Sequence, residues 1–163
     1  MDDFAEFFGA RRDVVFRAVL VTLGDRVGAE DATAEAFARA CQRWASVREH
    51  PNPTAWVIRT ALNVSRSWWR HRRREVLRAD DVSVGAQVAA PAEPFDASLY
   101  AAVAALPRRQ REVIALRVLV DLSADETGRL LSIGTATVHV HLHRALDALR
   151  ATVVPDREIG RPC

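Results

Sequence analysis

The stretch from Pro53 to Glu75 constrains the fold more than any other part of this chain. Turned at about 100° per residue, its apolar side chains gather on one side of a helix and its arginines on the other. The apolar side comprises Val57, Ile58, Ala61, Leu62 and Val64. The opposite stripe comprises Arg59, Asn63, Arg66, Arg70 and Arg74, with Trp56 close to it. The pattern predicts a helix, continuing through Arg74 or beyond, that is buried on one side and presents a cationic face to a partner.

The second half of this stretch, from Asn63 to Glu75, holds five arginines and two tryptophans. Arginines at this density favour phosphate, and an aromatic ring can stack on a base that has left the duplex. Trp68 and Trp69 fall on the margins of the apolar side, which favours a packing role and leaves Trp56 as the better stacking candidate. A charge run is most often a solvated helix end, but its continuity with the upstream stripe favours DNA as the partner.

Two more helices are predicted before this stretch. Apolar spacing indicates one from Phe4 to Leu23, ended by a left-handed cap at Gly24, and another from about Ala29 to Trp44. Glu30 and Asp31 are expected in the first turn of the second helix, where carboxylates suit the helix dipole. The expected buried side of this helix comprises Ala32, Ala36, Phe37, Ala40, Cys41 and Trp44.

Two segments break the helical pattern. Prolines mark a loop from Ser46 to Pro53, in which Asn52 is the expected N-cap of the next helix and Pro53 its first residue. The segment from Ala79 to Pro94 has no sustained helical period, and its prolines and small residues are typical of a flexible linker. The chain is therefore expected to form two domains.

Two short helices are expected after the linker. The first covers Ala97 to Leu106 and is stopped by Pro107, and the second covers Arg108 to Val120. The residues of the second helix that should turn inward are Val113, Ile114, Leu116 and Val120.

A helix-turn-helix follows these two helices. Ser123 and Glu126 form a capping box that opens a short helix ending near Leu131. After a tight turn, a last helix begins at Thr135, and Gly128 is small enough to let the two helices approach. The inner stripe of the last helix comprises Val138, Leu142, Leu146, Leu149 and Val153.

The composition is that of a globular protein. The chain has 163 residues, of which 49% are hydrophobic and 27% charged. All 23 basic residues are arginines although the net charge is only +2, which fits a GC-rich coding bias. No signal peptide or membrane span is predicted, and Cys41 and Cys163 are too few for a secreted disulfide framework, so a cytoplasmic protein is expected.

The sequence contains no strong pattern for a catalytic site or a metal site. It has no paired carboxylates, no nucleophile with a matching base and no phosphate-binding glycine loop, so we predict neither catalytic residues nor a cofactor. His139 and His143 share a helix face and could chelate zinc, but DNA contact or solvation is the favoured role and no metal is predicted. Cys41 is expected to be buried rather than to sense redox state.

Four blocks of sequence stand in an order and spacing that point to one family. They are Ala29 to Phe37, Thr54 to Asn63, Leu106 to Val113 with Leu122 to Glu126, and Thr137 to Leu146. Together they resemble the extracytoplasmic-function (ECF) sigma factors of the sigma-70 family, and Ser67 to Arg70 is similar to an actinobacterial branch. The resemblance implies an all-α fold of two small helical domains: sigma region 2 in residues 1–78, a linker in 79–96, the region 4 helix-turn-helix in 97–153, and a tail in 154–163.

The resemblance also implies an activity and a set of partners. A sigma factor binds core RNA polymerase and directs promoter recognition and opening, and RNA synthesis belongs to the polymerase. Glu30, Asp31 and Glu35 would contact the clamp of the largest polymerase subunit, and region 4 the flap of the second. Promoter DNA and an anti-sigma factor are further implied partners, and a membrane is not.

The resemblance divides the implied DNA-binding residues between two promoter elements. Residues for the -10 element are Trp56, Arg59, Asn63, Arg66, Arg70, Arg73 and Arg74, with the loop before them as a pocket for an unstacked base. Residues for the -35 element are Arg108, Arg109, Arg111, Ala136, Thr137, His139, Val140, His143 and Arg144. Early positions of the last helix would reach base edges, while the arginines would hold phosphates.

An alternative function is a conventional helix-turn-helix regulator that binds an operator as a dimer without entering polymerase. This reading accounts for residues 97–153 and leaves the first half of the chain without a role. A palindromic footprint obtained without polymerase would favour it.

Overall fold

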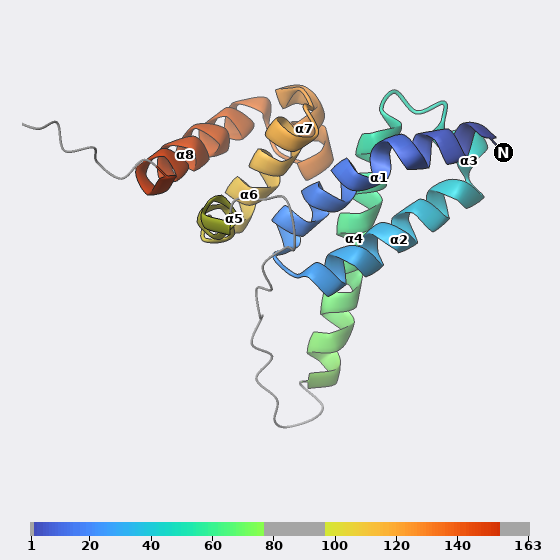
Figure 1. The fold of residues 1–163 in the computed structure, drawn as a ribbon, viewed down its shortest axis with the longest axis horizontal. Coiled ribbons are helices and arrows are strands. Elements are labelled where there is room, and N and C mark those ends of the chain that lie inside the picture. The colour runs from blue at the N-terminus through green and yellow to red at the C-terminus, as the bar shows by residue number, and fades with distance from the viewer. Residues whose placement is uncertain (1, 77–96, 154–163) are drawn as a thin grey trace, which may run out of the picture.

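The computed structural model describes residues 2–76 and 97–153, and every regular element in these two segments is a helix. The first segment forms α1 (Asp2–Leu23), α2 (Arg26–Gln42), α3 (Trp44–Val47) and α4 (Pro53–Val76). The second forms α5 (Ala97–Ala104), α6 (Arg108–Ile114), the π-helical turn η1 (Ala115–Leu119), α7 (Ala124–Leu131) and α8 (Thr135–Val153). Figure 1 shows the two groups of helices lying side by side. The all-α prediction is confirmed, and the predicted linker lies outside the described residues.

The core of the first group lies where α2 packs against α1 and α4. The predicted apolar side of α4 is confirmed, since all five of its residues, from Val57 to Val64, are buried. Ala29, Ala32, Ala36 and Ala40 of α2 are fully buried as well. Their short side chains let the helix backbones approach closely, and this close packing fixes α4 in the domain.

The start of α2 differs from the sequence prediction. The helix begins at Arg26 rather than near Ala29, because the side chain of Asp25 accepts a hydrogen bond from the Gly28 N–H at 3.1 Å and caps it. Glu30 and Asp31 consequently lie beyond the first turn, and the prediction that placed them there is wrong.

Most of the predicted boundaries around α1 and α4 are confirmed. Gly24 ends α1 with a φ of 69°, and Pro53 is the first residue of α4. The side-chain oxygen of Asn52 accepts from the Ala55 N–H at 3.0 Å, as expected of an N-cap. The predicted loop from Ser46 to Pro53 is shorter than expected, because α3 continues through Val47.

The helix-turn-helix is formed by α7 and α8. Ser123 accepts from the Glu126 N–H at 3.1 Å while Glu126 accepts from the Ser123 N–H at 2.8 Å, so the capping box is confirmed. A Cβ added at Gly128 would lie 2.7 Å from the carbonyl oxygen of Ile133, which confirms why only glycine lets the turn close against α7. Ser132 takes the left-handed conformation, with φ at 58°, and redirects the chain into α8.

The helix predicted from Arg108 to Val120 is divided in the structure. It is α-helical through Ile114 and continues as η1, where the Val120 N–H donates to Ala115 O at 3.2 Å, five residues back. The wider turn lies against α1 of the first group. The irregular segment is therefore at the contact between the two groups of helices.

Candidate nucleic-acid interface

The predicted DNA stripe on α4 faces solvent along most of its length. Arg59, Asn63, Arg70 and Arg74 are exposed, and Arg66 is half-buried. Trp56 is half-buried and packs against the core, so only part of its ring is available to a base. The stripe thus offers guanidinium groups in a row, a spacing that suits a phosphate backbone running along the helix.

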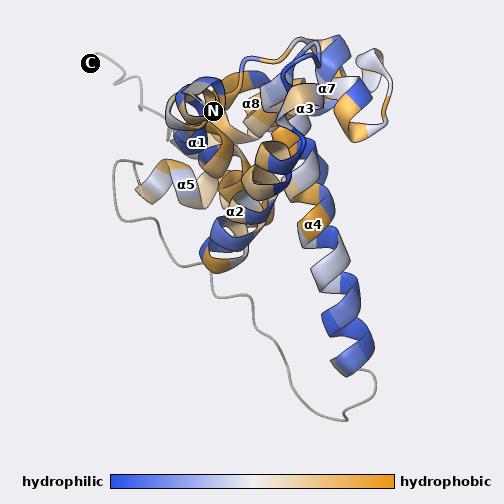
Figure 2. Ribbon diagram, turned by 90° about the vertical axis from the view of Figure 1, so that its right-hand side faces the viewer, coloured by the Kyte–Doolittle hydropathy of each residue, from blue (hydrophilic) through white to orange (hydrophobic). Residues whose placement is uncertain are grey.

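The last turns of α4 extend beyond the other helices, where they form a hydrophilic arm (Figure 2). Trp68 is half-buried against the core, which confirms its predicted packing role. Trp69 is 59% exposed, and the guanidinium carbon of Arg73 lies 4.6 Å from the centroid of its ring. The prediction that Trp69 packs is therefore wrong, because its margin of the helix has no neighbouring helix to cover it.

One carboxylate gathers three of the predicted DNA-binding arginines. Glu112 of α6 has a fully buried side chain, and its Oε1 accepts from Arg108 Nε at 3.0 Å and from an Arg66 guanidinium nitrogen at 3.4 Å. Its Oε2 accepts from Arg109 at 2.8 Å. Arg66 comes from α4, so residues predicted for two different promoter elements meet at one side chain.

The burial of Glu112 makes this cluster more than a surface ion pair. An ionised carboxylate shielded from water needs charged or hydrogen-bonded partners, and three guanidinium groups supply them here. Sequence spacing gives a signal for Arg108 and Arg109, which lie four and three residues before Glu112 on one helix. No local pattern indicates Arg66, which is 46 residues away.

A second polar contact joins the same two groups of helices. The side-chain amide of Asn52, at the start of α4, donates to Glu126 Oε1 at 3.1 Å, at the start of α7. The hydrogen bond from the Ser123 N–H, followed by the one from Asn52, lowers the pKa of Glu126. A single carboxylate therefore caps one helix and contacts the N-cap of the other.

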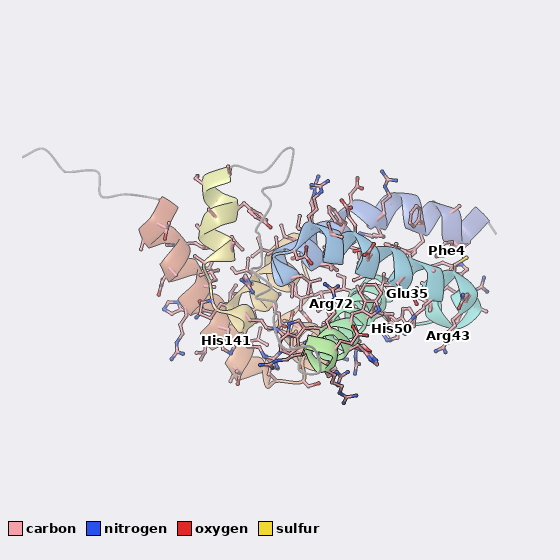
Figure 3. The ribbon with its side chains drawn as sticks, turned by 90° about the horizontal axis from the view of Figure 1, so that it is seen from below. Phe4, Glu35, Arg43, His50, Arg72 and His141 are labelled. Atoms are coloured by element: carbon pink, nitrogen blue, oxygen red, sulfur yellow. The ribbon has the colours of Figure 1, made fainter. Side chains whose placement is uncertain are left out.

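The predicted polymerase-binding residues lie together on α2. Glu30 and Asp31 are exposed and Glu35 is half-buried, and Figure 3 labels Glu35 on α2 and Arg72 on α4, the helix against which α2 packs. Glu30 pairs with Arg26 at 2.9 Å and Glu35 with Arg39 at 2.7 Å. Exposed pairs of this kind contribute about 0.3–0.5 kcal/mol, so a basic partner can displace them.

The predicted face of α8 lies in solvent. Its exposed residues are Ala136, Thr137, His139, Val140, His143 and Arg144. The first positions carry short side chains, so a base edge could approach the helix closely, and His143 pairs with Asp147 at 3.2 Å. Arg111 points elsewhere: it is half-buried and donates to the carbonyl oxygen of Ala104 at 2.9 Å, which ties α6 to the end of α5.

Three other features were candidates for a functional role: a metal site, a membrane-spanning helix and Cys41. Within residues 2–76 and 97–153, no group of three or more histidine, cysteine or acidic side chains is arranged to hold a metal ion. In the same segments, no helix combines the length and the apolar character that a membrane crossing requires. Cys41 is exposed, so the prediction that it is buried is wrong: it lies outside the stripe that α2 turns toward the core.

Comparisons with known proteins agree on one family. Residues 7–75 match the family model described as Sigma-70 region 2, and residues 96–149 match the one described as Sigma-70, region 4. The chain is 30% identical to the RNA polymerase sigma-E factor of Streptomyces coelicolor, over 93% of this chain and 86% of that protein. It is 28% identical to the ECF RNA polymerase sigma factor SigW of Bacillus subtilis, over 91% of this chain and 88% of that protein.

A solved structure shares the arrangement of helices. The sigma factor RpoE from Bartonella quintana, crystallised with the anti-sigma factor NepR, superposes with a TM-score of 0.81 at 21% identity, covering 96% of this chain and 100% of that one. Its likeness shows the fold. The two family models and the sequence relatives show more, because they cover both groups of helices described above: the chain belongs to the ECF sigma factors of the sigma-70 family.

Proposed function

We propose that this ECF sigma factor directs core RNA polymerase to a two-part promoter, with α4 at the -10 element and α8 at the -35 element. The observation that carries the proposal is the solvent-facing arginine stripe of α4 within the region 2 match. A stripe of this kind is suited to hold a phosphate backbone while bases leave the duplex. As a subunit of polymerase, the protein would act in the cytoplasm and would contribute no catalytic group of its own.

The acidic surface of α2 is the proposed polymerase contact. Glu30, Asp31 and Glu35 lie on the helix that packs directly against α4, so a partner held there would also position the DNA stripe. The pairs that Glu30 and Glu35 form with arginines of α2 are weak, so a basic partner can compete for both carboxylates. The proposed partner is the clamp of the largest polymerase subunit, with region 4 against the flap of the second.

The opening of DNA is assigned to α4 and the loop before it. Trp56 and the loop of residues 48–52 lie at the start of the stripe, where an unstacked base could be held against the ring. Arg59, Asn63 and Arg70 would then follow the strand along the helix. Trp69 adds a mostly exposed ring at the far end of the stripe, and the sequence analysis did not assign this ring to DNA.

The -35 element is assigned to α8. Ala136, Thr137 and His139 lie in the first turns of the second helix of a helix-turn-helix, the part of such a motif that reaches base edges in the major groove. Arg144 lies further along and would hold a phosphate. An anti-sigma factor is a further proposed partner, since the related RpoE was crystallised with one.

Reconstitution with core polymerase tests the proposal. The purified chain should form a complex with core enzyme and direct transcription from a selected set of promoters, whose mapped start sites would give the two elements. Trp56→Ala should impair promoter opening, measured by permanganate reactivity of thymines, more than closed-complex binding. Failure to bind core polymerase, or a palindromic footprint without it, would instead support a conventional dimeric regulator.

A further inference from the structure

An apolar cavity of about 140 Å³ lies between α1 and the second group of helices. Val21 of α1 forms one wall, and the other walls come from α5, α6, η1 and α8. We infer that this cavity is a binding site for a small neutral molecule with a largely apolar body, about the size of a benzene ring. The cavity lies apart from the proposed DNA and polymerase surfaces, so this role does not depend on the proposed function.

The walls of the cavity are almost entirely hydrocarbon. They are side chains of valine, leucine and isoleucine together with Tyr100, whose hydroxyl oxygen is the only polar side-chain atom of a lining residue. This hydroxyl is buried and has no hydrogen-bond partner among the described residues. Burial raises the pKa of Tyr100, so the hydroxyl stays uncharged at neutral pH. The walls therefore offer a ligand no charge, and a charged molecule would lose its hydration without compensation.

The volume of the cavity fits one small ring. Apolar cavities of about 150 Å³ in protein interiors stay dry and bind benzene, because water finds no hydrogen-bond partners in them. A ring that enters such a cavity gains contacts with wall atoms that otherwise face empty space. Val21, Val103 and Ile114 are at most 9% exposed, so a ring beside them is shielded from water. Leu99 and Val118 also line the cavity but are exposed, which gives a ligand a way in from solvent.

The π-helical turn η1 forms part of the cavity. Val118 and Leu119, both in this turn, are lining residues. A π turn holds one more residue than an α turn, and such turns inside α-helices are frequent at functional sites. The regular helix that the sequence predicts through Val120 would direct these two side chains differently. The irregular turn and the cavity thus coincide, which favours a binding site over a packing defect.

A molecule bound in the cavity would contact both groups of helices. It would touch Val21 of α1 and, on the other side, Leu146 and Leu149 of α8, which are half-buried. Because the site needs walls from both groups, binding would stabilise the contact between them by mass action. The cavity thus gives a small apolar molecule a means to regulate the protein without covering α4 or the exposed face of α8.

Titration of the whole chain with fluorobenzene, followed by methyl NMR, tests the site directly. Ile114 lines the cavity and Ile58 lies in the core of the first group, so the two isoleucines provide a site signal and a control in one spectrum. The methyl resonances of Ile114 should shift and saturate with a dissociation constant of about 1 mM, while those of Ile58 stay in place. Benzoate, which has a ring and a charge, should shift neither.

A cavity-filling variant tests the site independently. Val103→Phe places ring atoms inside the cavity, and Val27→Phe adds the same atoms at an exposed position of α2. Val103→Phe should weaken fluorobenzene binding about tenfold or more, because the space for the ligand is taken, while Val27→Phe should bind like wild type. Fluorobenzene should also raise the melting temperature of wild type and of Val27→Phe, but not that of Val103→Phe.

Three results would overturn the inference: a shift that does not saturate, equal shifts at Ile58 and Ile114, and equal fluorobenzene affinities for Val103→Phe and Val27→Phe. If Val103→Phe does not fold, Leu149→Phe, at a half-buried wall position, takes its place, and the wild-type titration decides on its own if neither folds. Transcription by reconstituted polymerase is a separate measurement. Its failure would refute the proposed function and leave the ligand site standing.

Discussion

The two helices proposed to contact DNA, α4 and α8, present different chemistry on their exposed faces. The face of α4 carries a row of arginines with tryptophans beside it, whereas the face of α8 carries Ala136, Thr137 and His139 in its first turns and Arg144 further along. Long guanidinium side chains hold phosphates at a distance, while short side chains let a helix backbone approach base edges. The difference in side-chain chemistry is the basis of the proposed division of roles, in which α4 captures a strand and α8 reads sequence in an intact groove.

The largest loss of stability is expected from a substitution at Gly128, where α7 and the turn before α8 approach each other closely. Gly128→Val would place side-chain atoms against the backbone carbonyl of Ile133, which lies 2.7 Å from an ideal Cβ, so we expect a loss of about 3 kcal/mol in the unfolding free energy of the helix-turn-helix. Denaturant unfolding measures the loss. Gly134→Ala in the same turn is the control, because its Cβ meets only Thr137 Oγ1 at 3.9 Å. An equal loss in both variants would contradict the close approach of α7 and α8.

Substitutions of Trp68 and Trp69 should distinguish residues of α4 that contribute to folding stability from residues that contribute to DNA binding. Trp68→Ala removes a half-buried ring from the core and should cost about 2 kcal/mol, less than the about 3–5 kcal/mol of a fully buried tryptophan. Trp69→Ala should leave the unfolding free energy within about 0.5 kcal/mol of wild type, because the ring is mostly exposed.

Promoter opening by reconstituted polymerase provides the second half of this test. Trp69→Ala should reduce opening severalfold, consistent with about 1–3 kcal/mol per stacked base. Opening at the wild-type rate would show that Trp69 stacks only on Arg73, whose guanidinium lies over its ring, and takes no part in strand capture.

Salt dependence should distinguish the two faces. Arg70→Ala on α4 should lower the slope of log affinity against log salt by about 0.9, the value for one lost phosphate contact on B-DNA, with little change in promoter preference. Thr137→Ala on α8 should leave the slope unchanged and relax the preference at one base pair of the upstream element. The opposite result, a changed slope from Thr137→Ala alone, would reverse the assignment of roles.

The smallest effect is expected in the pH dependence of folding stability in the acidic range. Because hydrogen bonds from Ser123 and Asn52 lower the pKa of Glu126 in the folded state, the stability they provide is complete above its usual pKa of 4.5 and is lost as pH falls through the lower, folded value. Glu126→Gln, which can still accept the capping bond, should unfold with less dependence on pH in this acidic range. Identical pH profiles for both proteins would show that the carboxylate contributes nothing there. Glu126 is only half-buried, so water weakens these interactions and the difference should be small.

Local sequence patterns were sufficient for most of the helices. The apolar side of α4, the cap at Gly24, the Ser123–Glu126 box and the close approach at Gly128 each depend on residues within a few positions of one another, and all are confirmed. The start of α2 is misplaced in the prediction because Asp25 caps the helix at Arg26, three residues before Ala29, where its apolar pattern begins.

The errors and omissions at the site have a different cause. The helical period places Trp68 and Trp69 on the two margins of the apolar side of α4 and does not distinguish between them. The packing of neighbouring helices covers Trp68 and leaves Trp69 exposed. Glu112 stands in a run of arginines and has the local sequence of a surface residue. Its burial and its contact with Arg66 come from the packing of helices that are distant in the sequence, which no local pattern contains.

The four buried alanines of α2 have a mechanical consequence. Because four of the residues that α2 turns inward are alanines, the backbone of α2 lies close to α1 and α4, and we expect α2 and α4 to move together. The acidic surface and the arginine stripe are two sides of one stiff body, and the position of one dictates the position of the other. A polymerase that binds α2 would therefore also set the orientation of α4 toward the DNA, with no flexible segment between the two surfaces.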